Sequence, residues 1–134
     1  MTEQEKELLI QGGFDVEKAL SRFLKKVDLY VSFLKKYEND GNFQKIEPAL
    51  EKGNLYEAYH AIHALKGLSG NLGILNVFQT TQDMLKEIKA RPGFDVTNDK
   101  AVFETLQGED VLWTQFQQLS AGHLNAVELI SKLG

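Results

Sequence analysis

Apolar residues recur at spacings of three and four along most of this chain, from Val16 to Tyr37, from Phe43 to Leu50 and on both sides of Gly73. That spacing brings apolar side chains onto one face of an α-helix. Only 2 of the 134 residues are prolines, so few positions interrupt a helix, and the length suits one compact domain. The pattern predicts an all-α fold.

Glycines and capping residues mark where the expected helices begin and end. Asp15, Asn54 and Asp110 stand where helix N-caps are expected, and Gly53 and Gly73 where helices end. Four long helices with short connections predict an antiparallel up-and-down four-helix bundle with a short additional N-terminal helix. The helices on either side of Gly53, and those on either side of Gly73, are expected to pack side by side.

Other segments carry weaker expectations. Residues 1–12 should form an N-terminal arm or short helix, because Gly12-Gly13 follows them, and residues 13–134 should form the bundle domain. Pro48 should kink its helix or restart it. The segment 95–108 reads as a loop, with a short helix at 101–106.

Composition and charge exclude several classes of function. The chain has no cysteine, which removes disulfides, thiolate zinc sites and cysteine nucleophiles. Its net charge of -4 argues against binding to nucleic acid, which needs a clustered basic surface. The N-terminus is acidic rather than basic and then apolar, and no apolar run approaches the roughly 20 residues that span a bilayer. We therefore expect a soluble cytoplasmic protein that does not contact membranes.

The segment 59–73 carries the chemistry. On a helix, one stripe of this region is apolar apart from a serine and should face the core; it consists of Leu55, Ala58, Ile62, Leu65, Ser69 and Leu72. His63 points away from that stripe. Its expected neighbours on the outward face are Tyr56, Tyr59, His60, Lys66, Gly67 and Gly70. Two glycines on this face need a reason, because each costs about 1 kcal/mol relative to alanine inside a helix.

A phosphoryl acceptor explains this outward face. An exposed imidazole is a nucleophile at neutral pH. Lys66 lies one turn further on and could place an ammonium beside a phosphoryl group. Gly67 removes any side chain next to the ring, so another protein could approach it closely. The glycines after His63 follow a helix rather than a strand, so they do not form a phosphate-binding loop, and a partner must supply the rest of the chemistry.

At these residues the chain resembles the histidine-containing phosphotransfer (HPt) domains of multistep two-component phosphorelays. The family pattern His-x-Leu-Lys-Gly-x-Ser-x-Asn-Leu-Gly is matched at every fixed position by His63-Ala64-Leu65-Lys66-Gly67-Leu68-Ser69-Gly70-Asn71-Leu72-Gly73. A looser similarity covers residues 14–20, residues 50–54 and the helix after Gly73. The resemblance thus spans most of the chain from about Gly13 onward.

The resemblance implies a four-helix bundle in which His63 takes a phosphoryl group from one receiver aspartate and passes it to another. Lys66 would give charge support and Gly67 steric clearance. The expected partners are receiver domains of hybrid sensor kinases and of response regulators. Mg²⁺ is expected on the receiver and no cofactor on this chain, which would be a monomeric phosphocarrier without kinase activity of its own. Since the sequence holds one module and no kinase or receiver segment, we expect a free-standing protein, with an excised domain as the alternative.

Two positions depart from the family. Members often place a glutamine on the helix after the histidine, and the aligned position here holds Leu85. Gln82, one turn earlier, could substitute for it. Leu68 stands where a small residue is common and could enlarge an apolar docking surface. The residues expected to dock a partner are Tyr59, His60, Gly70 and Gln82.

Two alternatives belong to other classes of protein. Glu57 and His60 form one Glu-x-x-His, which helical di-iron proteins use for metal ligands, but such sites need a second copy, and this chain has one. The second alternative is a helical interaction module with the same fold and no phosphotransfer. The intact His63, Lys66 and Gly67 argue against that module.

Overall fold

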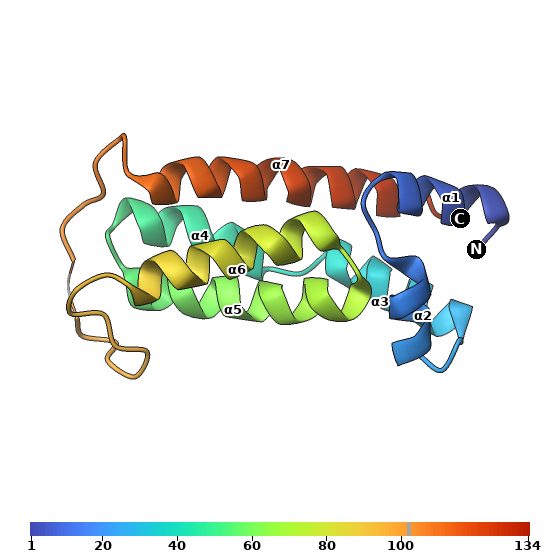
Figure 1. Ribbon diagram of the computed structural model, residues 1–134, viewed down its shortest axis with the longest axis horizontal. Coiled ribbons are helices and arrows are strands. Elements are labelled where there is room, and N and C mark those ends of the chain that lie inside the picture. Colours follow the sequence, from blue (N-terminus) through green and yellow to red (C-terminus); the bar gives the residue numbers. More distant parts are fainter. Residues whose placement is uncertain (102) are drawn as a thin grey trace.

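The computed structural model describes residues 1–101 and 103–134, and within them the regular structure is entirely helical (Figure 1). This confirms the all-α prediction. The seven helices of the described residues are α1 (Glu3–Gln11), α2 (Val16–Arg22), α3 (Val27–Glu38), α4 (Asn42–Glu51), α5 (Leu55–Leu72), α6 (Leu75–Lys89) and α7 (Val111–Ser131). None of them is both long and apolar enough to cross a membrane.

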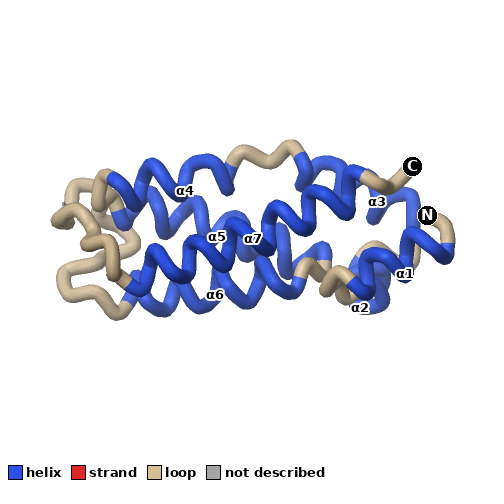
Figure 2. Tube along the Cα trace, turned by 90° about the horizontal axis from the view of Figure 1, so that it is seen from above, coloured by secondary structure: helices blue, strands red, loops and turns tan. Residues whose placement is uncertain are grey.

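The long helices α5, α6 and α7 lie alongside one another and alternate in direction (Figure 1). The shorter helices α3 and α4 follow one another along the length of the molecule (Figure 2). α3 packs against α5 and α7, and α4 packs against α5. The expected neighbours across Gly53 and across Gly73 therefore do pack side by side, as α4 with α5 and α5 with α6.

Helix α1 packs on the body of the protein through Leu9 and is hydrogen-bonded to the C-terminal residue through Glu5. Thr2 caps it through a reciprocal pair of hydrogen bonds with Glu5. Leu9 is fully buried, and α1 packs against α2 and α7. The Glu5 carboxylate also accepts a hydrogen bond from the backbone N–H of Gly134 at 2.7 Å, so the two termini lie close together (Figure 1).

The connection between α2 and α3 has an unusual backbone. Asp15 caps α2 as expected, by accepting from the N–H of Lys18 at 3.1 Å. After α2, Leu24 and Lys25 both have a left-handed backbone, with φ of 55° and 60°. L-amino acids with a side chain rarely adopt this conformation. The left-handed backbone at Leu24 and Lys25 interrupts the apolar helical pattern that runs from Val16 to Tyr37, so that this pattern forms two helices, α2 and α3.

Helix α4 continues through Pro48, which lies on its exposed side. The expected restart at this proline therefore does not occur.

The turn between α5 and α6 explains why Gly73 is a glycine. Its φ is 74°, and a Cβ atom added there would lie 2.5 Å from the carbonyl oxygen of Asp15. The segment before α2 pins this turn, since Asp15 donates its N–H to the Gly73 carbonyl and Leu75 donates to the Gly13 carbonyl. The N-terminal residues thus fix the point at which α5 ends.

Side chains from α2 and α3 satisfy the last carbonyl groups of α5. The hydroxyl of the buried Tyr30 donates to the carbonyl of Leu72 at 2.8 Å. The Arg22 guanidinium donates to the carbonyl of Gly70 at 2.9 Å. A positive charge at a helix C-terminus also interacts favourably with the helix dipole. These contacts hold the C-terminal half of α5 in place.

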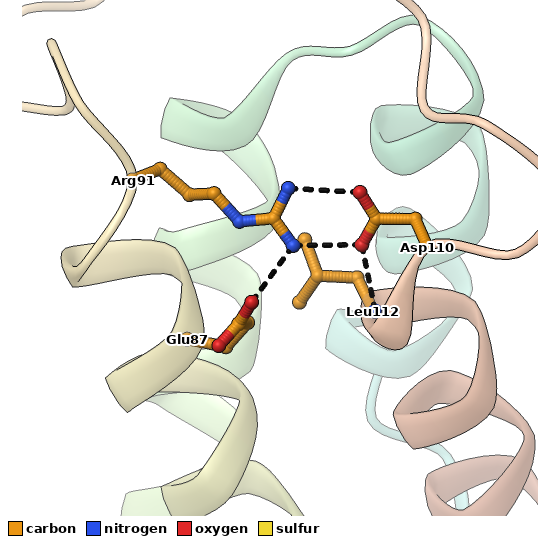
Figure 3. Close-up of polar contacts among 4 residues, drawn as sticks. All are labelled: Glu87, Arg91, Asp110 and Leu112. Atoms are coloured by element: carbon orange, nitrogen blue, oxygen red, sulfur yellow. Dashed lines mark hydrogen bonds and ion pairs between the residues drawn. The ribbon is translucent and has the colours of Figure 1, made fainter.

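The long connection between α6 and α7 is closed at its base by an ion pair. Arg91 donates to both carboxylate oxygens of Asp110, at 2.8 and 2.7 Å, and also to Glu87 (Figure 3). Asp110 caps α7 at the same time, by accepting from the N–H of Leu112. The Arg91 guanidinium and the Leu112 N–H hold the pKa of the Asp110 carboxyl below its usual value.

The short helix expected at 101–106 is absent from the described residues of that range, and residue 102 lies outside them. This prediction is wrong because the segment packs in an irregular conformation against the body of the protein instead of forming a helix. Phe94, Phe103 and Leu106 pack against the hydrophobic core. A Cβ atom at Gly53 would lie 2.7 Å from the carbonyl oxygen of Phe103. The backbone of the connection thus lies directly on the turn that precedes α5.

The core contains the stripe expected on α5, whose members are all buried: Leu55, Ala58, Ile62, Leu65, Ser69 and Leu72. The hydroxyl of Ser69 donates to the Lys66 carbonyl, so this serine has a hydrogen-bond partner inside the core. His123 of α7 is buried too, hydrogen-bonded through Nδ1 to the Tyr37 hydroxyl at 2.8 Å and stacked on Phe43. His123 is therefore a structural residue of the core.

Candidate functional site

His63 lies on α5 with its side chain exposed, on the side opposite the buried stripe. Among the described residues its ring makes no hydrogen bond, whereas the other two histidines each have one, to Val96 and to Tyr37. Both ring nitrogens of His63 thus remain free of protein partners. An imidazole in this state is sterically and chemically open to an electrophile.

A shallow hollow of about 250 Å³ begins at His63 and continues along α5 towards α6. Its walls are His63, Lys66, Gly67, Gly70, Asn71 and Phe78. The half-buried Lys66 places its ammonium 5.9 Å from the centre of the Phe78 ring. That position, one turn from His63, keeps a cation beside the imidazole. The expected grouping of His63, Lys66 and Gly67 is present.

The two glycines of this face differ in their surroundings. A Cβ atom at Gly67 would meet nothing in the described part of the chain within 4 Å, so this position is open to solvent. A Cβ atom at Gly70 would lie 3.1 Å from the ring of Phe78. Gly67 therefore leaves space for something outside the chain, and Gly70 leaves space for an aromatic ring of α6.

Tyr59 does not lie on the outward surface, so its expected outward position is wrong, and its role in docking a partner stays a prediction. It is only 6% exposed and belongs to the core cluster. The α6–α7 connection covers it, because the ring of Phe94 lies 5.2 Å from the ring of Tyr59. The helix geometry of α5 alone places Tyr59 outward, but it takes no account of a segment that folds over the helix from elsewhere.

The other residues expected to dock a partner have varied surroundings. His60 is exposed, and its Nε2 donates to the Val96 carbonyl at 3.0 Å. Gly70 lies in the wall of the hollow. Gln82 is half-buried on α6 and is not among the walls of the hollow, where α6 contributes Phe78 instead. Leu85, at the position of the family glutamine, is buried.

A larger groove of about 440 Å³ adjoins the hollow at Asn71, which lines both. Its walls come from α2, α3, the turn after α3, and α5, and they are Arg22, Phe23, Phe33, Lys36, Tyr37, Asp40, Leu68, Asn71 and Leu72. Leu68, the second departure from the family pattern, is thus one of the apolar walls of this groove.

Sequence reasoning missed Phe78 and Asn71 as walls of the hollow. The glycine at position 70 was the available signal for Phe78, since a helix glycine often accommodates a large side chain from a neighbouring helix. No signal in the sequence indicated that Phe94 would cover Tyr59, because the two residues belong to segments with no common periodicity.

Among the described residues, Glu57 and His60 are not arranged as ligands of a metal centre. The N–H of Glu57 donates to the Asn54 side chain at 3.0 Å, and its carboxylate accepts from the same amide at 3.2 Å, so Glu57 takes part in capping α5. Within residues 1–101 and 103–134, no group of three or more histidine, aspartate or glutamate side chains is placed to hold a metal ion.

A scan against protein-family models, a search of curated proteins and a search of solved structures each find no match to this chain.

Proposed function

We propose that this protein is a histidine phosphotransfer protein of the HPt type. It accepts a phosphoryl group on His63 from the aspartate of one receiver domain and passes it to a second receiver domain. The observation that supports the proposal most is the exposed imidazole of His63, which makes no hydrogen bond among the described residues and lines one hollow together with Lys66 and the open position at Gly67. The motif from His63 to Gly73 adds the resemblance to the family.

The architecture is compatible with this proposal. We take α3 and α4 together as one interrupted helix, which with α5, α6 and α7 would make the antiparallel four-helix bundle that the proposal requires. α5 is held at its C-terminal half by Arg22, Tyr30 and the Gly73 turn. Such a support keeps the imidazole in a fixed position while partners bind and leave.

The chemistry divides between two proteins. A ring nitrogen of His63 attacks the phosphorus of an aspartyl phosphate; a P–N bond forms, the acyl P–O bond breaks, and the aspartate carboxylate leaves. The transition state is loose and its charge is spread over the phosphoryl oxygens, so positioning and nearby cations supply most of the catalysis. The receiver brings Mg²⁺ and its acidic pocket, and this chain brings the imidazole and Lys66. Transfer to a second receiver reverses these steps.

The test uses a panel of receiver domains, phosphorylated with radiolabelled phosphate and incubated with the purified protein. We expect acid-labile, alkali-stable label on the protein, and no label on the His63→Gln variant. His60→Gln is the control for the site of labelling: it removes a second exposed histidine of the same helix, and the variant should still acquire label, whatever its rate, because His63 is intact. Label that persists in His63→Gln would contradict the site, and absence of label from every receiver would contradict the function.

A further inference from the structure

The buried Tyr59 lies one helical turn before His63 and contacts its ring from the side of the protein. The two ring centres are 6.1 Å apart and their planes differ by 21°. On the side away from solvent, Tyr59 is itself held in place, since it belongs to the core cluster. A rigid aromatic ring against one side of an exposed imidazole restricts the rotamers that the imidazole can adopt.

The α6–α7 connection holds Tyr59 against α5. Phe94 packs on the Tyr59 ring with centres 5.2 Å apart, and Lys89 places its ammonium 5.8 Å from the same ring. The Val96 carbonyl accepts from Nε2 of His60, the residue next to Tyr59 on α5. At the base of the connection, the Arg91–Asp110 pair fixes where it leaves α6 and enters α7 (Figure 3).

These contacts form a continuous path from the connection to the candidate nucleophile. We propose that Tyr59 is a positioning residue for His63 and that Phe94, by covering Tyr59, makes the α6–α7 connection part of the phosphotransfer site. This inference rests on the proposed function for its effect on transfer, but the orientation of His63 is measurable without any transfer. The side chain of Phe94 acts through Tyr59 and is expected to contact neither the phosphoryl group nor the receiver.

The aromatic ring of Tyr59, rather than its hydroxyl, is the part that matters. Among the described residues the hydroxyl makes no hydrogen bond to another side chain, whereas the ring has four neighbours, Phe94, His60, His63 and Lys89. Tyr59→Phe should therefore behave like the unmodified protein. Tyr59→Leu and Phe94→Ala should both release the His63 ring.

The experiment combines two measurements on these three variants and on Phe43→Ala. Phe43 is a partly buried ring that packs on Phe116 and His123, far along the chain from His63, so this control loses aromatic packing without touching Tyr59. NMR spectra of the His63 ring report its surroundings, and the rate of phosphorylation by a labelled receiver, or by phosphoramidate as a small donor, reports its function.

We expect the His63 ring resonances to shift in Tyr59→Leu and Phe94→Ala and to stay in place in Tyr59→Phe and Phe43→Ala. The phosphorylation rate should fall between about 10-fold and about 100-fold in the first two variants, as misplacement of a reacting group does. Unchanged His63 resonances in both Tyr59→Leu and Phe94→Ala would overturn the inference, as would an equal shift in Phe43→Ala. Phe94→Leu, which keeps an apolar side chain over Tyr59, replaces Phe94→Ala if that variant does not fold. If neither the unmodified protein nor any variant is phosphorylated, the proposed function fails. The NMR resonances of the His63 ring still decide whether Tyr59 positions it.

Discussion

At the scale of single residues, Gly67 shows a conflict between stability and access. Glycine inside a helix costs about 1 kcal/mol relative to alanine. Apart from its chain neighbours and the backbone of its own helix, no atom of the described residues lies within 4 Å of the place that a Cβ would occupy, so no packing contact among them requires a glycine at this position. The lower helix stability that glycine causes is explained if a partner has to approach the imidazole of His63 across Gly67.

Gly67→Ala should therefore stabilise the protein and impair its function. We expect the free energy of unfolding to rise by about 1 kcal/mol, because the alanine fills open space and favours the helix. Phosphorylation by a receiver should slow, because the methyl group lies where the receiver has to approach. Urea unfolding and the labelling rate measure the two effects.

Gly70→Ala is the matched control for this prediction. Its methyl group would lie 3.1 Å from the Phe78 ring, so the packing cost offsets the gain in helix propensity and no comparable stabilisation is expected. A Gly67→Ala variant that is phosphorylated as fast as the unmodified protein would contradict the role given to this glycine.

Most of the candidate site could be predicted from the sequence because its residues belong to one helix. The spacing of His63, Lys66 and Gly67 fixes their mutual positions once α5 forms, and the structure places them around one hollow. The position of Tyr59 could not be predicted in this way. Its burial depends on Phe94, which comes from a segment without helical periodicity, and helix geometry does not place such a segment.

At the scale of elements, the α2–α3 connection stores backbone strain in two residues with side chains. A left-handed backbone costs an L-residue roughly 1–2 kcal/mol, and glycine avoids most of that cost. Leu24 has a φ of 55° and is 77% exposed, so its side chain contributes little packing. This position is a natural place to increase stability.

Leu24→Gly should raise the free energy of unfolding by up to about 1 kcal/mol, since the relief of strain exceeds the added entropy of the unfolded chain. Thermal and urea unfolding measure the change. Lys26→Gly is the control, because Lys26 has a φ of −83° and gains nothing from a glycine. A loss of stability in Leu24→Gly would mean that Leu24 makes contacts that outweigh its strain.

Asp110 joins two elements, since it caps α7 and pairs with Arg91 at the end of α6. Asp110→Ala removes both interactions and should lower the free energy of unfolding by about 2–4 kcal/mol, from the cap and the charge-assisted hydrogen bonds together. Asp110→Asn keeps an oxygen for the cap and should lose about half as much. Urea unfolding at neutral pH measures both variants, and equal losses would contradict the division between cap and ion pair.

The pH dependence of this pair follows from the lowered pKa of Asp110. A carboxyl whose pKa is lower in the folded state stabilises the fold at neutral pH. That contribution is lost as the pH falls below the ordinary value of 3.8 and through the lower folded value.

Helix boundaries could be predicted where a local signal sets them. Asp15, Asn54 and Asp110 cap helices as expected, and Gly73 ends α5 with a left-handed backbone. The break at Leu24 and Lys25 has no such signal, because neither residue type favours a left-handed backbone. The helix expected at 101–106 failed because packing of Phe103 and Leu106 on the core outweighs a weak local preference.

At the scale of the whole molecule, a buried histidine connects three helices. His123 of α7 is hydrogen-bonded to Tyr37 of α3 and stacked on Phe43 of α4, and burial lowers its pKa. A histidine whose pKa is lower in the folded protein than in the unfolded chain is compatible with the fold when its ring is neutral and destabilises the fold when its ring is protonated. The unfolded chain then binds a proton more readily than the folded protein does as the pH falls below about 6.5.

The protein should therefore lose stability as the pH falls below about 6.5, before its paired carboxyls titrate. His123→Gln keeps a polar partner for Tyr37 and cannot titrate, so its free energy of unfolding should depend less steeply on pH in this range. Urea unfolding at several pH values compares the two proteins. Equal slopes would show that protonation of His123 does not drive the acid sensitivity.

We propose that His63 alone accepts phosphate from a partner, although His60 of the same helix is exposed as well. This proposal is tested most directly by mapping the phosphorylated residue after the unmodified protein has been incubated with phosphorylated receiver domains. Peptide mass spectrometry under alkaline conditions preserves a phosphohistidine for this purpose. We expect phosphate on His63 and its transfer from there to a second receiver; phosphate on His60 or His123, or none from any receiver, would contradict the proposal.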